Sequence, residues 1–169
     1  MEKYLELRLL PSNIIVETYS VRTPLYYKCL MINAETQRRG DAEKVENLLS
    51  EQVLDAAIEV HRTLGGPGLL ESLYEDALFH ELRLRGIPAL SQVQIPVTYK
   101  NCRLRDPMRL DILVDGKLII EVKATEKVLA VHKAQVLTYL RLTRLKLGIV
   151  ANFGQSRLID GWDRVVNDL

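Results

Sequence analysis

Residues 109–123 read RLDILVDGKLIIEVK, and the expected architecture follows from them. Two aliphatic runs, Leu110–Val114 and Leu118–Val122, are joined through Asp115 and Gly116. Two apolar runs on either side of a short Asp-Gly turn are typical of an antiparallel β-hairpin. We therefore expect this hairpin at the centre of a β-sheet.

Two registers are open for the hairpin. A two-residue loop would place Asp111 opposite Ile120 and mix charged with aliphatic side chains on each face. A three-residue loop pairs Ile112 with Ile120 and separates the two kinds of side chain. We favour the three-residue loop, because cross-strand partners share a face. Its other expected pairs are Val114 with Leu118, Leu110 with Val122, Asp111 with Glu121 and Arg109 with Lys123.

Asp111, Glu121 and Lys123 interrupt these otherwise apolar strands. A buried carboxylate is costly unless a charge or a hydrogen bond compensates it. A divalent cation removes the repulsion between two neighbouring carboxylates, and their hard oxygen atoms suit Mg²⁺ or Mn²⁺. Lys123 shares a side with Glu121 by the two-residue period of a strand, and its ammonium could steady a water molecule or a phosphate. The alternative is a structural Glu121–Lys123 pair on an exposed sheet face.

The rest of the chain predicts helices and further strands around this hairpin. The first helix is expected from Ser50, as an N-cap between Leu49 and Leu54, with at most a short helical turn before it over Asp41–Leu48. Gly86 is expected to end the second helix. The other expected elements are helices at Leu69–Arg85 and His132–Arg144, and strands at Val93–Tyr99, Leu147–Ala151 and Arg157–Ile159. Pro96 marks the first of these strands as an edge or a bulge.

These elements predict an α/β fold with a mixed sheet of about four main strands flanked by helices. The length of 169 residues suits one domain. We expect residues 1–40 to be an irregular arm or linker and residues 41–169 to be the folded domain. The arm before about residue 40 is expected to be dispensable for folding, so that a chain starting at Met31 still folds cooperatively.

The composition limits the functional classes. The net charge is +1, from 23 basic and 22 acidic side chains, so total charge neither indicates nor excludes a nucleic-acid partner. No apolar run approaches the ~18 residues of a membrane helix, and we expect no membrane partner. The two cysteines, Cys29 and Cys102, have no zinc-site spacing and favour a reducing, cytoplasmic compartment.

Some polar and aromatic side chains are interpreted more simply. We expect His61 and His80 to be packing or helix-surface residues, and Tyr99 and Trp162 to pack in the core or at its rim. A solvated polar face and a basic patch beside the site are equal alternatives for a set of basic residues. They are Arg105, Arg109, Lys127, His132, Lys133, Arg141, Arg144 and Lys146.

One motif carries a resemblance to a known family. Residues Gly68 to Tyr74 read GLLESLY, which has the form GxxExxY. This segment resembles the signature of the GxxExxY proteins, a family placed in the PD-(D/E)xK nuclease superfamily. The similarity covers about residues 50–167. It includes Asp111–Val114, Ile120–Ala124 and Asn152–Gly154.

The resemblance implies a restriction-endonuclease-like PD-(D/E)xK core and a set of site residues. Glu71 looks like the acid of the first helix, and Asp111 like the acid of the second strand. Gln135 and Tyr139 look like the QxxxY motif of RecB-like nucleases. The implied catalytic residues are Glu71, Asp111, Glu121, Lys123, Gln135 and Tyr139, and the implied ligands of Mg²⁺ or Mn²⁺ are Asp111, Glu121 and Glu71.

Three functions follow as hypotheses. The first is a metal-dependent nuclease that hydrolyses phosphodiester bonds in DNA or RNA. The second is a non-catalytic module on the same fold that binds nucleic acid or protein. The third gives residues 1–40 a structural or regulatory role in oligomer contacts, such as those of a homodimer.

Overall fold

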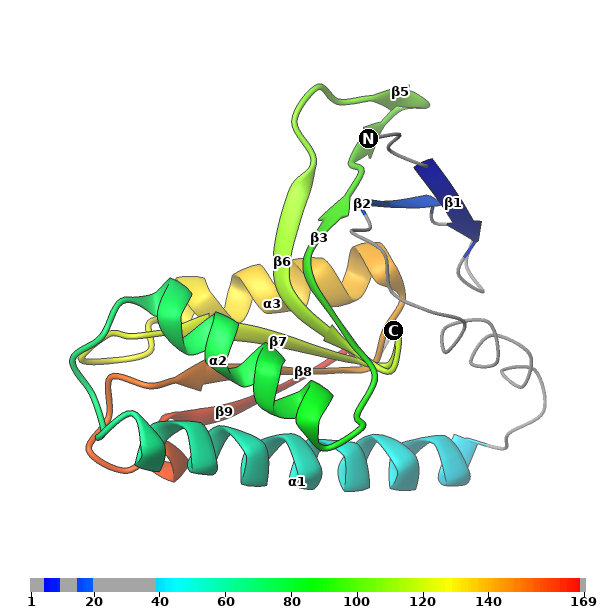
Figure 1. Cartoon of the computed structure of the whole chain (residues 1–169). Coiled ribbons are helices and arrows are strands. Elements are labelled where there is room, and N and C mark those ends of the chain that lie inside the picture. Colours follow the sequence, from blue (N-terminus) through cyan, green and yellow to red (C-terminus); the bar gives the residue numbers. More distant parts are fainter. Residues whose placement is uncertain (1–4, 10–14, 20–38, 168–169) are drawn as a thin grey trace.

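The computed structural model describes residues 5–9, 15–19 and 39–167, and its main sheet has five strands in the order β3-β6-β7-β8-β9 (Figure 1). The β7–β8 pair is parallel and the other three pairs are antiparallel. The sheet is therefore mixed, as predicted, with one strand more than expected. The strands are β3 (Ala89–Ile95), β6 (Met108–Val114), β7 (Leu118–Lys123), β8 (Leu147–Asn152) and β9 (Trp162–Val166).

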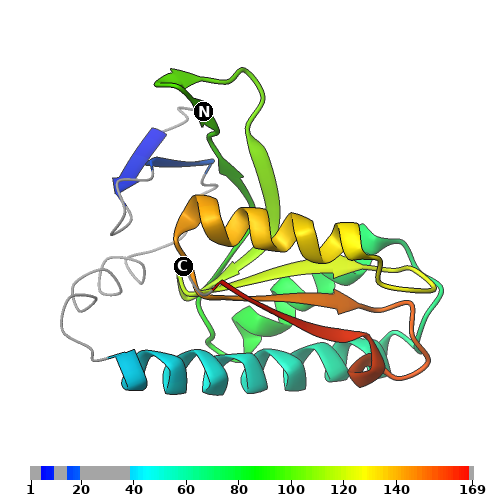
Figure 2. The same ribbon diagram turned by 180° about the vertical axis from the view of Figure 1, so that it is seen from behind.

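Helices cover both faces of this sheet (Figures 1 and 2). Helices α1 (Arg39–Thr63) and α2 (Glu71–Leu84) pack on one face, and α3 (Ala130–Thr143) packs on the other. Each face has its own cluster of buried aliphatic side chains, because the central strands are apolar on both sides. The predicted α/β architecture is confirmed.

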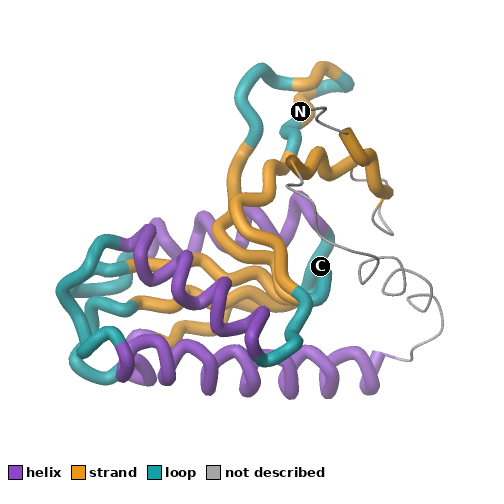
Figure 3. The backbone as a smooth tube through the Cα atoms, viewed as in Figure 1, coloured by secondary structure: helices purple, strands orange, loops and turns teal. Residues whose placement is uncertain are grey.

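Two small strand pairs lie outside the main sheet (Figure 3). Strands β1 (Leu5–Leu9) and β2 (Ile15–Tyr19) pair with each other, and so do β4 (Thr98–Tyr99) and β5 (Cys102–Arg103). The β4–β5 hairpin projects from the end of β3 and β6 (Figure 1). No helix in the described part of the chain is long and apolar enough to cross a membrane.

The predicted start of the first helix is wrong. Helix α1 begins at Arg39, so Ser50 lies inside the helix and is buried instead of capping it. After Gly40 the sequence DAEKVENLL contains no glycine or proline that would stop a helix. The helical turn expected over Asp41–Leu48 and the helix expected from Ser50 are therefore one element.

The ends of two strands also differ from the prediction. Strand β3 stops at Ile95, before Pro96, because proline cannot donate to the ladder; it is the edge strand that Pro96 indicated. The strand expected at Arg157–Ile159 is wrong. That segment leads into the 3₁₀ helix η2 (Leu158–Gly161), and the final strand is β9.

The hairpin register is the favoured one over half of its length. Ile112 pairs with Ile120, and both pack in the core under α1 and α2. The expected continuation is wrong, because Leu110 packs under α3 instead of opposite Val122. Residues two apart in a regular strand share a face. Strand β6 therefore twists between these two positions, at Asp111.

The neighbouring strand changes face at the same level. Ala89 packs with the α1 and α2 cluster, whereas Val93 packs with the α3 cluster. Between them Gln92 has a left-handed backbone with φ of +54°, and the pairs on either side place it opposite Asp111. A residue with a left-handed backbone interrupts the alternation of side chains between the two faces of a sheet. The side chains that follow it then point to the other face.

Gly148 of β8 lies where α3 approaches the sheet most closely. A Cβ at this position would be 2.4 Å from Cγ1 of Val136, so Gly148→Ala must push α3 away. We expect the free energy of unfolding to fall by about 1–3 kcal/mol, measured by urea denaturation. Val136→Ala removes the clashing atom, so the double variant should lose less than the sum of the single losses. Strictly additive losses would contradict this packing.

The folded domain is proposed to need none of residues 1–30. Among residues 44–167, whose burial the structure describes, every buried side chain of the two core clusters lies between Leu49 and Leu158. A chain that begins at Met31 should therefore unfold in one cooperative transition in urea, with a midpoint close to that of the full chain. A broad or missing transition would show that the first 30 residues belong to the core.

Candidate active site

The site lies where β6 and β7 separate. Their ladder ends at the Ile112–Ile120 pair. Beyond this pair the amide of Val122 donates to Oδ2 of Asp111 at 2.8 Å instead of to a β6 carbonyl. The predicted pairing of Asp111 with Glu121 is therefore not a ladder pair, because the twist at Asp111 turns β6 away toward β3.

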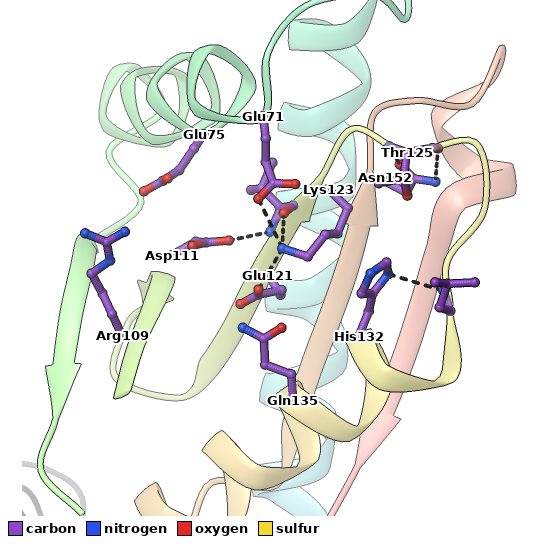
Figure 4. Close-up of polar contacts among 12 residues, drawn as sticks. Glu71, Glu75, Arg109, Asp111, Glu121, Lys123, Thr125, His132, Gln135 and Asn152 are labelled. Atoms are coloured by element: carbon purple, nitrogen blue, oxygen red, sulfur yellow. Dashed lines mark hydrogen bonds and ion pairs between the residues drawn. The ribbon is translucent and has the colours of Figure 1, made fainter. Parts of the chain in front are cut away.

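Lys123 is the hub of the site (Figure 4). Its Nζ donates to Oε1 of Glu121 at 2.8 Å, to the carbonyl of Val122 at 2.8 Å and to Oε1 of Glu71 at 3.2 Å. These contacts use all three N–H groups of the ammonium. The expected meeting of Glu71, Glu121 and Lys123 is thus present, with the ammonium between the two carboxylates.

Glu121 is the most buried carboxylate of this group. Its side chain is 2% exposed, and its Oε2 is buried with no hydrogen-bond partner. Burial raises the pKa of Glu121 to about 7, with a further contribution from the charge of Asp111, while Lys123 opposes the shift. A buried carboxylate oxygen that accepts no hydrogen bond destabilises the folded protein. Binding of a proton or a cation at Oε2 would remove this cost.

The two other central groups respond to the same surroundings. Burial raises the pKa of Asp111, although the amide of Val122 and the charge of Lys123 oppose the shift. Burial acts to lower the pKa of Lys123, but hydrogen bonds and charges of Glu121 and Glu71 outweigh it and raise that pKa. Lys123 is therefore protonated at neutral pH and acts as a hydrogen-bond donor and a positive charge.

The GxxExxY segment positions Glu71. The hydroxyl of Tyr74 donates to the carbonyl of Gly66 at 2.7 Å and accepts from the amide of Leu69 at 3.1 Å. Gly68 has φ of +123°, a backbone conformation that favours glycine. Tyrosine and glycine together fix the loop that enters α2, and Glu71 is the first residue of that helix. The motif therefore has a structural role beside its acid.

Gln135 and Tyr139 form a pair on α3. Gln135 donates to the hydroxyl of Tyr139 at 2.8 Å, and that hydroxyl donates to the carbonyl of Arg109 at 2.6 Å. The amide of Gln135 points toward Glu121 in Figure 4. The QxxxY residues thus link α3 to the start of β6, beside the site.

The comparison with protein families agrees with this geometry. Residues 47–165 match the model described as the PD-(D/E)XK nuclease superfamily. This chain belongs to that superfamily. No curated protein and no solved structure matches the chain.

The candidate site includes a polar support that the sequence interpretation left without a role. The amide oxygen of Asn152 accepts from the backbone amides of Thr125 and Gly154, and its nitrogen donates to the carbonyl of Thr125. Asn152 is fully buried and lies beside Lys123 on the neighbouring strand. It fixes the chain immediately after the ExK segment. A polar residue at the end of the aliphatic β8 run was the available signal.

Glu75 is a second residue that sequence reasoning missed. It is buried, its carboxylate accepts from the amide of Gln92, and burial raises its pKa, with a smaller contribution from the charge of Asp111. Figure 4 shows it near Asp111 and Arg109. Its position four residues after Glu71 puts both acids on one face of α2, which was the signal available.

Two residues of the predicted basic patch have partners of their own. Lys133 pairs with Asp163 at 2.6 Å. His132 uses its Nδ1 to accept the backbone amide of Leu129 at 3.2 Å. His61 is a packing residue, as predicted, because it is buried and its Nε2 contacts the carbonyl of Gln155 at 2.9 Å.

The site residues fit a hard divalent cation, which PD-(D/E)XK nucleases typically use. Within residues 39–167 and the two short strands before them, no three His, Cys, Asp or Glu side chains form a ready group of ligands. The Oε2 of Glu121 nevertheless has no hydrogen-bond partner, and the charges of Asp111 and Glu71 are close enough to raise the pKa of Glu121. Such a donor set, without nitrogen or sulfur, suits Mg²⁺ or Mn²⁺.

Glu121 makes the stability of the metal-free protein depend on pH. The folded protein keeps a proton on Glu121 up to about pH 7, whereas an ordinary glutamate loses it near pH 4.5. The free energy of unfolding should therefore fall as pH rises between these values. Glu121→Gln cannot ionise, and at pH 8 we expect it to be more stable than the wild type by on the order of 3 kcal/mol.

The measurement is urea unfolding in EDTA at several pH values. Glu59→Gln is the matched control, because Glu59 is paired with Arg62 on the surface and its pKa is lowered. It should follow the wild-type profile above pH 4.5. A wild-type stability that rises with pH across this range would contradict the raised pKa of Glu121.

Proposed function

We propose that this protein is a metal-dependent nuclease that hydrolyses phosphodiester bonds of DNA or RNA. The observation that carries the proposal is the meeting of Lys123 with the buried Glu121 at the point where β6 and β7 separate, beside Asp111. Membership of the PD-(D/E)XK superfamily supports it. The motif at residues 68–74 supports the finer assignment to the GxxExxY proteins.

The proposed roles follow from the contacts. Asp111, Glu121 and Glu71 would hold Mg²⁺ or Mn²⁺, which when bound lowers the pKa of a water molecule and offsets charge on the phosphate. In hydrolysis, a water oxygen bonds to phosphorus, the bond to one ester oxygen breaks, and that oxygen takes up a proton. Lys123 would hold the attacking water or the phosphate through an N–H group.

Lys123 must change partners to do this. All three of its N–H groups are used by Glu121, Glu71 and the carbonyl of Val122. The contact to Glu71 is the longest of them, at 3.2 Å, and the side chain of Glu71 is 44% exposed. Glu71 is therefore the partner that Lys123 would release. Gln135 and Tyr139 are proposed to orient the phosphate and the carboxylate of Glu121 from α3.

A non-catalytic binding module on the same fold is the second candidate. The observation that favours it is the fully satisfied ammonium of Lys123, which could be a structural ion pair.

The proposed location is the cytoplasm, and the free, exposed thiol of Cys102 fits a reducing compartment.

Cleavage assays test the proposal directly. Labelled single-stranded and duplex DNA and RNA are incubated with Mg²⁺ or Mn²⁺ and separated by electrophoresis. We expect the wild type to cleave at least one substrate. Asp111→Ala should reduce the rate by a factor of at least about 100, as is usual when a site that stabilises developing charge is lost. Equal cleavage by both proteins would point to a contaminating nuclease.

Metal binding is tested separately by thermal unfolding. A ligand that binds only the folded state at a hundredfold excess over its dissociation constant stabilises it by about 2.7 kcal/mol. Melting temperatures should rise with Mg²⁺ or Mn²⁺ but not with KCl of matched ionic strength. Asp111→Asn should abolish the rise while its side-chain oxygen can still accept from Val122.

Lys123→Ala is the matched variant for these melts. It should keep most of the metal response and lose cleavage, because lysine is not a ligand. An equal melting shift for the wild type and Asp111→Asn would show that these carboxylates do not bind the metal, and the binding module would become the preferred function.

A further inference from the structure

The β4–β5 hairpin has no role in the core. Residues 98–107 are ten consecutive exposed positions. The hairpin closes with a tight turn in which Lys100 and Asn101 have φ of 46° and 66°, and the amide of Leu104 donates to the carbonyl of Val97 at 2.8 Å. Short hairpins without buried side chains are marginally stable. Packing in the core of the domain therefore does not account for the residue types found in this hairpin.

The composition of the hairpin suits a polyanion. Between residues 98 and 107 there are three basic side chains, Lys100, Arg103 and Arg105, and one acidic side chain, Asp106, although the whole chain carries only +1. Tyr99, which the sequence interpretation placed in the core or at its rim, is 61% exposed, so that prediction is wrong for Tyr99. The ammonium of Lys100 lies 5.4 Å from the centre of its ring.

The hairpin is also joined directly to the site. Strand β6 leads from the hairpin to Asp111, and Arg109 is an exposed cation on the way. Arg109 lies close enough to Asp111 to act on its pKa, and Figure 4 shows the two side by side. Apart from Asp106, the charged side chains between the hairpin and the edge of the site are therefore positive.

From this arrangement we infer that the β4–β5 hairpin binds the phosphate backbone of the nucleic acid whose scissile phosphate lies at Asp111. The inference rests on the proposed nuclease function and adds a substrate-binding surface to it. Asp111 follows Arg105 by six positions, so the extended chain between them spans at most about 20 Å. At roughly 3.4 Å per nucleotide of a duplex strand, Arg105 therefore lies within about six nucleotides of the scissile phosphate. Tyr99 offers its ring to a sugar or an unpaired base.

The test is a binding measurement on the full chain carrying Asp111→Asn, which prevents cleavage of the probe. The probes are fluorescein-labelled 30-base-pair duplexes of DNA and of RNA with the same sequence, followed by anisotropy over a range of KCl concentrations. The hairpin variant adds Lys100→Ala, Arg103→Ala and Arg105→Ala. The charge-matched control adds Lys44→Ala, Arg83→Ala and Lys117→Ala, which are exposed on α1, on α2 and in the β6–β7 turn at the other end of β6.

We expect the hairpin variant to bind the DNA duplex at least about tenfold more weakly than its parent. The slope of log K against log[KCl] should become shallower by about 2 to 3, since each phosphate contact contributes ~0.9. The control variant should have the same affinity and the same salt dependence as the parent. Equal melting temperatures of the three proteins would show that the loss is not one of folding, as expected for ten exposed positions.

The outcomes separate this inference from the function on which it rests. Equal affinity and equal salt dependence of the hairpin and control variants, with the parent protein binding, would overturn the hairpin surface alone. Binding that depends on the hairpin, in a protein whose wild type cleaves nothing, would overturn the nuclease and retain the surface. A parent protein that binds neither duplex would overturn the hairpin surface, and the cleavage assay on single-stranded and duplex substrates decides the nuclease separately. A loss on RNA but not on DNA would support the surface and identify RNA as the nucleic acid that it binds.

Discussion

The site depends on one hydrogen bond, from the backbone amide of Val122 to the carboxylate of Asp111. In an uninterrupted sheet that amide would donate to a carbonyl of β6, and the two strands would stay paired. Here the acid takes the place of the carbonyl, so β6 leaves with β3 while β7 stays with β8. A sheet that opens in this way exposes the end of an otherwise buried strand to solvent. Glu121 and Lys123 lie on that strand, which is how polar groups come to stand in an aliphatic core.

The charges gathered at the opening do not balance. Lys123 is the only cation in direct hydrogen-bond contact with Glu71 and Glu121 among the described residues. The carboxylates of Asp111 and Glu75 add further negative charge beside them, and burial raises the pKa of each. Removing one partner of a buried ion pair usually lowers the stability of the folded protein. Unpaired buried charges of the same sign also lower it, because they repel one another. This excess of carboxylate is an observation that supports the proposed cation binding.

The supports of the site have a common feature, since each one fixes a backbone segment next to a charged side chain. Tyr74 fixes the loop before Glu71, and Asn152 fixes the loop after Lys123. Gln92, with its left-handed backbone, holds Glu75 and lies opposite Asp111. A left-handed residue other than glycine costs about 1–2 kcal/mol. Backbone strain of this size opposite Asp111 fits a site in which the orientation of the Asp111 carboxylate is important.

The sequence by itself determined the sheet centre, the flanking helices and the proximity of Asp111, Glu121 and Lys123. These follow from local rules: aliphatic runs, a short turn, and charges that interrupt apolar strands. The start of α1 could not be read in the same way, because Ser50 has the chemistry of a cap but follows a continuous run of helix formers. Only the tertiary structure decided that Leu110 and Ile112 lie on opposite faces, that Glu75 joins the site and that Tyr99 is exposed. Each of these depends on the twist at Gln92 and Asp111, where two strands distort together, and a pattern that assumes regular strands cannot show such a distortion.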